Sequence, residues 1–452
     1  MLERLVKTVR DIVGIRDVRR RILMTFALLF VYRIGSHVFL PYVDIEKIEQ
    51  RLKEDRGGLL QWVEYTSALT GGNLENATFF SLGIMPYITA SIIMSLLVKV
   101  IPRLEALSKE GESGRRAINR YTRYGTVLVA IVQGIFIVIF LRSVFGEGDA
   151  KASIAIIDRD SPWWNTFTGG TQLLCLILGA VFLMWLGEKI TDYGIGNGAS
   201  VLIMAGIIAR MPMAFAFLGR EIANAGEDRP FKVVWALSVA VLFVAIVVAV
   251  VFITRGQRRI PIQQARTVRG RRVYGGTKHY MPLRVNSAGV MPIIFAQALV
   301  VLPPKLIAGV TGLAALGQYF NPGAFWYHVA YILLIIFFSY FWTTLMYNPV
   351  EIAKNIQEHG SFIPGIRPGR RTAEYLERIM SRITLAGAVF LALIALTPEL
   401  VRGSLDVDYV VASLLGGTSM LIVVGVALDV VDKVEAQLLV RQYDGFVRGG
   451  GE

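Results

Sequence analysis

Two related stretches decide how this chain is expected to fold: SLGIMPYI at residues 81–88 and SAGVMPII at residues 287–294. Each has a glycine followed by a proline in the first turn of a predicted helix, where the missing N–H has no helical partner in any case. A long apolar run follows both copies. The pattern predicts two helices that begin in the same way in the two halves of the chain.

A second pair of stretches repeats at a similar separation. GASVLIMAG at residues 198–206 resembles GTSMLIVVG at residues 417–425. Chance recurrence of short apolar words is the alternative explanation in a hydrophobic chain. Two matches at comparable separation favour an internal duplication.

The composition indicates an integral membrane protein. Hydrophobic residues make up 54% of the 452 residues, whereas soluble domains are about 45–50% apolar even with glycine counted. The one cysteine, Cys175, lies in an apolar run, which excludes a disulfide framework and argues against a cysteine-based metal site. The four histidines have no ligand spacing, so we expect no metal and no cofactor.

Ten apolar segments are long enough to cross a bilayer, for which a helix needs about 20 residues. They fall near residues 22–40, 82–101, 124–144, 170–187, 198–218, 231–254, 287–306, 326–347, 383–401 and 409–430. We therefore predict an all-α integral membrane protein with ten transmembrane helices. Residues 1–21 are basic and predict an amphipathic helix at the cytoplasmic surface. No small-residue cleavage site follows the first span, so we expect it to be retained.

The basic residues predict the orientation of the spans. When Lys and Arg are sorted by alternate loops, most of the 47 fall on the side that holds both termini. The positive-inside rule then places both termini in the cytoplasm. The repeated stretches lie in the second and seventh spans and in the fifth and tenth, and partners separated by an odd number of spans run in opposite directions. The duplication is therefore predicted to be an inverted repeat of two five-helix halves.

The motifs do not point to an enzyme. GESGRR at residues 111–116 has glycines and positive charge, but it lacks the spacing of a nucleotide-binding P-loop. GIGNG at residues 194–198 follows a membrane helix and not a strand, which favours a tight turn over a dinucleotide loop. The deepest ionisable residues within spans are Arg33 and Arg210. An ion-coupled transporter normally keeps acids or broken polar helices at mid-membrane.

Isoleucines occupy matched positions of the repeats. Ile88 matches Ile294, Ile203 matches Ile422, and Ile84 precedes Ile88 by one helical turn. Ordinary core or lipid-facing isoleucines are one interpretation. The functional interpretation is an apolar constriction at the centre of symmetry, because branched alkyl groups close a pore by dewetting without offering a binding site.

Two loops on the predicted cytoplasmic side carry more charge than orientation requires. Residues 255–286 hold nine Lys or Arg and no acid, and residues 348–382 hold six with four acids. The first loop is dominated by arginine, including Arg258 and Arg259, which favours phosphate recognition. Docking of an acidic or RNA-rich partner, contact with anionic lipid headgroups and a purely topogenic role are the three interpretations.

Several motifs resemble, in order, those of the SecY family, the channel-forming subunits of the bacterial protein translocase. The resemblance runs from about residue 15 to residue 445. It rests on GESGRR at 111–116, GIGNG at 194–198, GRRVY at 270–274, IPGIRPG at 363–369 and GGTS at 416–419.

The resemblance implies a ten-helix clamshell around a central pore, which passes unfolded secretory polypeptides across the membrane and releases hydrophobic segments laterally into lipid. It implies a plug on about residues 57–81 and a lateral gate between the second and seventh spans. It places a pore ring on Ile84, Ile88, Ile203, Ile294 and Ile422. It places the docking of cytoplasmic partners on Arg271, Arg272 and Arg367, to which the charge of the loop adds Arg258 and Arg259.

The implied organisation begins with a cytoplasmic segment at 1–21 and a first half with five spans at 22–218. An outer loop and the sixth span follow at 219–254, the basic docking loop at 255–286, spans seven to ten at 287–430 and a cytoplasmic tail at 431–452. The implied partners are SecE, SecG, the SecA ATPase, the ribosome, translocating polypeptides with their signal sequences, and membrane lipid. The implied location is the bacterial plasma (inner) membrane. An inverted-repeat secondary transporter of a small solute is the alternative function.

Overall fold

The computed structural model describes residues 15–43, 77–146, 162–223, 229–264, 267–269, 272–274, 278–293, 295–296, 299–300, 324–405 and 417–449. The chain divides into two compact units, each of which is described by itself. The first unit comprises Met1–Ala216 together with Val426–Glu452, and the second comprises Phe217–Gly425. Of the predicted plug at residues 57–81, residues 57–76 lie outside the described residues, whereas residues 77–81 are described and pack in the core of the first unit.

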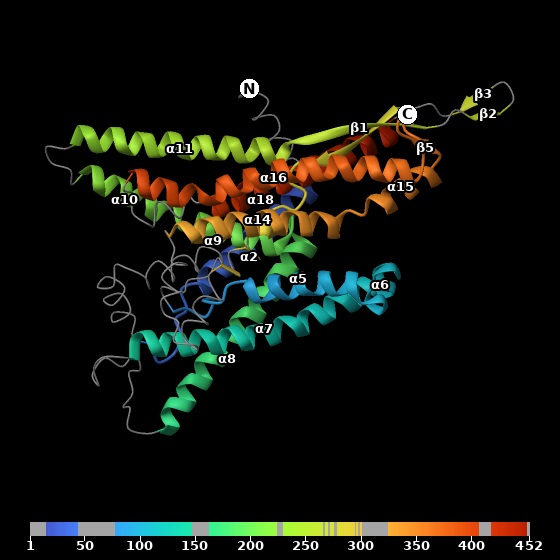
Figure 1. The fold of residues 1–452 in the computed structure, drawn as a ribbon. Helices are drawn as coiled ribbons and strands as arrows, with labels where there is room; N and C mark the ends of the chain where they lie inside the picture. Colours follow the sequence, from blue (N-terminus) through green and yellow to red (C-terminus); the bar gives the residue numbers. More distant parts are fainter. Residues whose placement is uncertain are drawn as a thin grey trace. The chain divides into compact units, whose positions relative to one another are not determined.

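The first unit is built from helices (Figure 1). They are α2 (Arg16–Gly35), α5 (Met85–Val100), α6 (Pro102–Lys109), α7 (Glu112–Gly146), α8 (Pro162–Tyr193), α9 (Gly198–Ile208), the first part of α10 (Met211–Ala223) and the last part of α18 (Gly417–Gly449). Helix α5 packs against α7, and α7 packs against α8.

Two predicted boundaries in this unit need correction. Helix α2 begins at Arg16, so part of the predicted surface segment and the first span form one helix. The predicted fifth span is divided into α9 and α10, because Pro212 lacks an N–H and its ring excludes the preceding turn of a continuous helix. Pro102 ends the predicted second span, in agreement with its boundary at residue 101, and α5 and α6 are bent by 99° there.

The second unit combines helices with β-strands. Its helices are the rest of α10, α11 (Arg229–Arg255), α14 (Phe325–Met346), α15 (Pro349–Glu358), α16 (Arg370–Leu405) and the start of α18. Its strands are β1 (Gln257–Gln264), β2 (Thr267–Arg269), β3 (Arg272–Tyr274), β4 (Lys278–Arg284) and β5 (Ser361–Phe362). Strands β1 and β4 form a long antiparallel ribbon (Figure 1).

The strands correct the prediction of an all-α chain. Strand β1 pairs with β4 on one edge and with β5 on the other, while β2 and β3 form a separate hairpin. The apolar side chains Ile260 and Leu283 point to one face of the ribbon and pack with Ile363 and Leu376. Helical periodicity cannot bury these residues, whereas the two-residue period of a strand places them on a single face.

The described residues contain five helical segments that are long and apolar enough to cross a membrane, or six if the bent α5–α6 pair is one span. The five are Glu112–Ile139, Phe167–Tyr193, Val233–Arg255, Phe325–Glu358 and Arg370–Thr397. Of these five, the segment in α11 is the most hydrophobic, with a mean hydropathy of 3.2, and only 17% of its most apolar stretch is buried. Apolar faces of this kind suit contact with lipid. The structure is that of a multi-pass membrane protein, and the count of ten stays a prediction.

Candidate functional site

Ile84 and Ile88 lie at the start of α5. Gly83 precedes them with a φ of 57°, in the left-handed region that favours glycine. Ile84 is the N-terminal capping residue of the helix and is only 2% exposed. The N–H of Ile88 donates to the carbonyl of Ile84 at 3.1 Å, and its side chain is half-buried. The two isoleucines are thus held by the first turn of the helix.

Helices α5, α8 and α9 meet at Gly187. A Cβ atom on Gly187 would lie 3.3 Å from Cδ1 of Ile84 and 3.6 Å from Cδ1 of Leu202. The next residue on α9, Ile203, is 7% exposed. The start of α5, which carries Ile84 and Ile88, therefore packs near α9, which carries Ile203, within the first unit. The absence of a side chain at Gly187 permits this close approach.

The other two predicted ring residues do not belong to the described part of the first unit. Ile422 lies on the part of α18 that belongs to the second unit, where it is 6% exposed. Ile294 lies outside the described residues. Gly289, which matches Gly83 in the repeat, has a φ of 64° and so adopts the same left-handed conformation. The two copies of the repeated stretch thus begin with the same backbone geometry.

The start of α9 is held by a side-chain cap that the GIGNG motif supplies. The Oδ1 atom of Asn197 accepts hydrogen bonds from the N–H groups of Ala199 and Ser200 at 3.1 and 3.4 Å. A Cβ atom on Gly198 would collide with the carbonyl oxygen of Gly187. The motif forms a turn that caps a helix, in agreement with the structural interpretation of this glycine-rich stretch.

An ion pair that the sequence analysis missed joins α7 to α8. Arg123 donates from Nε and Nη2 to the two carboxylate oxygens of Glu188, each at 2.8 Å. The Glu188 side chain is 20% exposed and that of Arg123 54%. Both residues lie at the same predicted membrane surface, at adjoining ends of consecutive spans. That placement was the available sequence signal for the pair.

Arg258 and Arg259 lie next to each other on β1, and both are exposed. Arg258 is opposite Leu283 and Arg259 is opposite Pro282 in the register of the ribbon. Because neighbouring residues of a strand point to opposite faces, Arg258 shares the face of buried Ile260. Arg259 shares the other face, which points away from the core.

This outward face of the ribbon is basic and aromatic. Its residues are Gln257, Arg259, Pro261 and Gln263 from β1, and Lys278, Tyr280, Pro282 and Arg284 from β4. Tyr280 is 63% exposed, and all four residues from β4 are exposed. Guanidinium groups around an exposed aromatic ring suit a partner with phosphates and stacked bases.

Arg367 lies in the loop between β5 and α16 and is exposed. Its carbonyl oxygen accepts a hydrogen bond from Oγ1 of Thr372 at 2.9 Å. Strand β5 pairs with β1 through Phe362 and Gln263, so the sheet joins the two predicted docking loops within one unit. Arg272 lies in β3 opposite Arg269. Arg271 lies outside the described residues.

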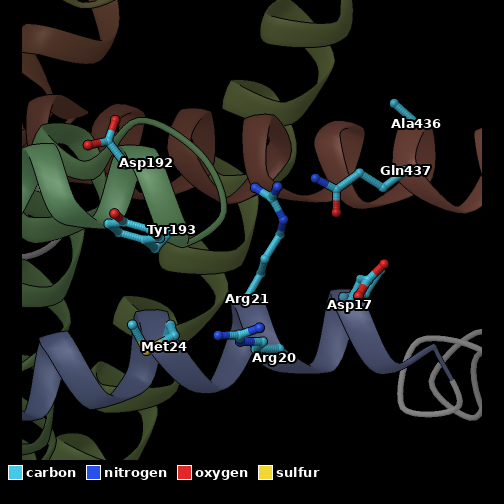
Figure 2. Close-up of a pocket in the computed structure, with 9 residues that line it drawn as sticks. Asp17, Arg20, Arg21, Met24, Asp192, Tyr193, Ala436 and Gln437 are labelled. Atoms are coloured by element: carbon cyan, nitrogen blue, oxygen red, sulfur yellow. The ribbon is translucent and has the colours of Figure 1, made fainter.

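A cavity of about 630 Å³ lies between α2, the C-terminal end of α8 and α18 (Figure 2). Its lining combines the carboxylates of Asp17 and Asp192 with the guanidinium groups of Arg20 and Arg21. Arg21 donates from Nη1 to the carbonyl of Gly194 at 3.4 Å. The sequence did not reveal this cavity, because its walls come from opposite ends of the chain.

The described part of the chain contains no group of three or more His, Cys, Asp or Glu side chains that could hold a metal ion.

Comparison with known proteins identifies the family. The SecY family model matches residues 78–431. The protein translocase subunit SecY of Streptomyces galbus is 42% identical over 451 residues, covering 96% of this chain and 97% of its own length. The subunit of the same name from Escherichia coli K12 is 42% identical over 441 residues, covering 96% of this chain and 95% of its own length.

Solved structures share the fold. A structure described as that of a protein conducting channel superposes with a TM-score of 0.59 at 17% identity, with 92% of both chains covered. Sec61 in the canine ribosome-channel complex from the endoplasmic reticulum gives a TM-score of 0.55 at 15% identity, again with 92% of both chains covered. On the family match and the near-complete coverage of its relatives, the chain belongs to the SecY family.

Proposed function

We propose that the chain is the channel-forming subunit of a protein translocase, which passes unfolded secretory polypeptides across the membrane and releases hydrophobic segments sideways into lipid. The observation that carries this proposal is the 42% identity to the translocase subunit of E. coli over 96% of the chain. As a member of this family, the chain is a channel subunit and not itself a catalytic enzyme. No observation on the described residues favours the small-solute transporter.

The proposed architecture is a clamshell of ten transmembrane helices in two inverted halves. The matched sequences support it, as does the shared left-handed conformation of Gly83 and Gly289. The first half would occupy residues 22–218 and the spans of the second half residues 231–430. Both termini would face the cytoplasm of a bacterium, in accordance with the positive-inside rule.

The proposed seal is a ring formed by Ile84, Ile88, Ile203, Ile294 and Ile422, with a plug on residues 57–81. The matched positions of Ile88 with Ile294 and of Ile203 with Ile422 in the repeated stretches support the ring. Branched alkyl groups offer no hydrogen bonds to water or ions, so a narrow ring of them closes by dewetting. A polypeptide can displace such side chains, because no specific bonds have to be broken.

Ion leakage through the resting channel tests the ring. We expect the double variant Ile88→Gly with Ile294→Gly to make proteoliposomes conduct ions in the absence of any substrate, because two of the five sealing side chains are removed. Ile93→Gly is the control, since Ile93 lies on the same helix with 44% of its surface exposed. A double variant that conducts no more than wild type would contradict the ring assignment.

We further propose that the outward face of the ribbon, together with Arg367, docks cytoplasmic partners. The fold shared with a channel from a ribosome complex supports the ribosome as one of them. SecA would dock at the same loops and supply the driving force by hydrolysing ATP, while SecE and SecG would be the other subunits. Arg271 and Arg272 would extend the basic surface along the loop.

Salt-dependent binding tests the docking surface. We expect Arg259→Glu to weaken binding of empty ribosomes and to reduce the slope of log affinity against log salt by about one, as for the loss of a single phosphate contact. Arg220→Glu makes the same charge change on α10, at the predicted outer surface, and is the control. If Arg259→Glu and wild type bind ribosomes equally at every salt concentration, the docking proposal is contradicted, and the charge of the loop serves only to orient the protein in the membrane.

A further inference from the structure

Two short segments on either side of residues 44–76 are bonded to each other. Phe39 and Thr78 form an antiparallel β-bridge. The N–H of Leu40 donates to the carbonyl of Ala77 at 2.8 Å, and the N–H of Phe79 donates to the carbonyl of Val38 at 2.9 Å. We call residues 38–43 together with 77–83 the neck, because chain leaving α2 and chain returning towards α5 pass through it side by side.

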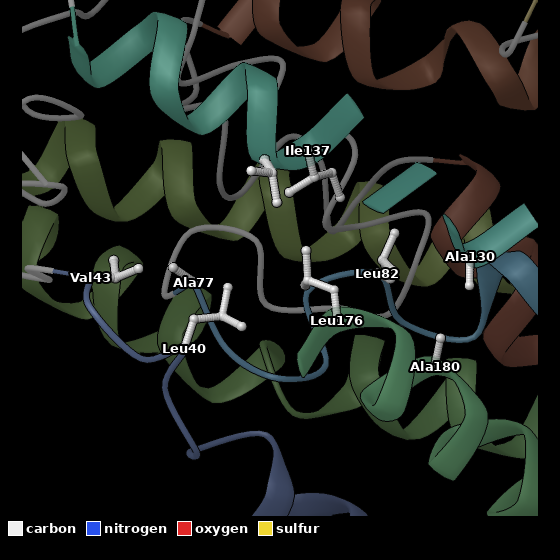
Figure 3. Close-up of a cluster of buried hydrophobic side chains, with 9 residues drawn as sticks. Leu40, Val43, Ala77, Leu82, Ala130, Ile137, Leu176 and Ala180 are labelled. Atoms are coloured by element: carbon white, nitrogen blue, oxygen red, sulfur yellow. The ribbon is translucent and has the colours of Figure 1, made fainter. Parts of the chain in front are cut away.

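The neck is part of the core of the first unit. Its buried side chains include Leu40 at 3%, Ala77 at 1% and Leu82 at 3% exposure. They pack against α7 and α8 in one apolar cluster, drawn in Figure 3, to which the helices contribute Ala130, Ile137, Val138, Leu176 and Ala180. Burial on this scale is unusual for a connection between two helices, which normally runs over a surface.

Aromatic stacking and two glycines fix the neck from the other side. The ring of Phe80 stacks on Tyr32 of α2 and on Phe182 of α8, with centroid distances of 6.0 and 5.9 Å. A Cβ atom on Gly35 would collide with the Phe80 ring, and one on Gly179 would collide with the carbonyl oxygen of Phe79. Both helices therefore approach the neck as closely as an α-carbon allows.

The neck also holds two residues in a strained conformation. Tyr42 and Ala77 have φ angles of 62° and 42°, in the left-handed region that residues with a Cβ rarely adopt. One lies in each of the two segments. Such strain persists only where the surrounding packing determines the backbone conformation. The packing around the neck is therefore strong enough to hold its backbone in a strained conformation.

A short series of hydrogen bonds connects the neck to Ile84. The N–H and the Oγ of Ser81 both donate to the carbonyl of Thr78, at 3.0 and 2.7 Å. The N–H of Gly83 donates to the carbonyl of Phe80 at 2.8 Å. Consecutive turns therefore lead from the bridge to Gly83, the residue before Ile84.

We infer that the neck is a fixed positioning element, which holds the start of α5, and with it Ile84 and Ile88, against α2, α7 and α8 during every stage of transport. The consequence for transport rests on the proposed function. The opposite possibility is that the two segments separate when the channel conducts. The two possibilities differ in whether the Phe39–Thr78 bridge has to break.

A disulfide across the bridge distinguishes them. The two hydrogen bonds flank Phe39 and Thr78, which makes them a non-hydrogen-bonded pair with Cα atoms about 4.5 Å apart, within the range that a disulfide accepts. The variant would combine Phe39→Cys and Thr78→Cys with Cys175→Ala, so that no other thiol competes. Among the described residues, Oγ1 of Thr78 has no hydrogen-bond partner, so its replacement breaks no hydrogen bond that the structure describes.

We expect the pair to oxidise readily, and the oxidised channel to translocate a secretory substrate at the rate of its reduced form. Inhibition by oxidation that a reductant reverses would overturn the inference, as would a pair that fails to form a disulfide. Failure of the wild-type chain to translocate the substrate would contradict the proposed function instead. In that case, amide hydrogen exchange at Leu40 and Phe79 tests the inference. A fixed neck requires these two N–H groups to exchange as slowly as those of α8, and faster exchange would overturn the inference.

A matched pair of glycine substitutions on α8 provides a second test. We expect Gly179→Ala to displace the neck, to speed exchange at Leu40 and Phe79 by about tenfold or more, and to raise ion leakage through the resting channel. Gly170→Ala should change neither, because nothing lies within 4 Å of a Cβ at that position. Equal exchange and leakage in the two variants would overturn the inference. Leu376→Ala, which disturbs the core of the other unit, controls for leakage caused by general destabilisation.

Discussion

Asn197 determines where α9 begins. Its side chain occupies two N–H groups of the first turn that have no partner within the helix. Helix α9 carries Ile203 and is too short to gain much stability from its own hydrogen bonds, which makes the cap important for the placement of the predicted ring residue.

We predict that Asn197→Ala lowers the free energy of unfolding by about 1 kcal/mol, the typical value of an N-terminal cap. The measurement is thermal unfolding of the purified protein in detergent. Asn197→Asp keeps an acceptor oxygen at the same position and should retain most of the stability. If the Ala and Asp variants lose the same amount, the hydrogen bonds to Oδ1 do not stabilise the helix.

Leu376 anchors the ribbon to α16. Its side chain is fully buried among Ile260, Leu283 and Ile363. We predict that Leu376→Ala costs about 2–5 kcal/mol of unfolding free energy, because the truncation leaves a cavity between sheet and helix. Leu385→Ala, at a position on α16 that is 49% exposed, should cost far less in detergent. Comparable losses at the two positions would contradict the packing of the sheet on α16.

At the scale of elements, the Arg123–Glu188 pair is a polar link between α7 and α8. Its paired N–O distances of 2.8 Å give the bidentate geometry that makes an arginine–carboxylate bond strong. Its partial exposure limits the contribution, since water screens the charges.

A double-mutant cycle with Arg123→Ala and Glu188→Ala should give a coupling energy of about 1 kcal/mol, measured by thermal unfolding. The comparison pair is Arg116 and Glu112 on α7, whose side chains are 76% and 81% exposed. For that pair we expect no more than about 0.5 kcal/mol, as for other exposed pairs one helical turn apart. If the coupling energy of Arg123 with Glu188 is no larger than that of the exposed pair, the ion pair does not stabilise the packing of α7 against α8.

At the scale of the whole molecule, the distribution of charge predicts the orientation in the membrane. We predict that a cysteine at Lys354, on α15, is protected from a membrane-impermeant maleimide in intact spheroplasts, and that a cysteine at Arg220, on α10, is labelled. Both positions are exposed in the structure, and both variants would carry Cys175→Ala. The reverse pattern of labelling would invert the topology and remove the docking loops from the cytoplasm. Labelling of both positions after lysis is the control for accessibility.

The amino-acid sequence by itself determined the membrane character, the positions of most helices, the repeated stretches and the family, because all of these depend on local composition, periodicity and motifs. Helix ends at Pro102 and Pro212 were also open to prediction, since a proline acts on its own turn. Only the tertiary structure decided that β1 pairs with both β4 and β5, that Arg259 lies opposite Pro282, and that Phe39 and Thr78 close the neck. Each of these depends on pairing between segments distant in the chain, and such pairing is selected by the packing of the whole core and not by the pattern of either segment alone.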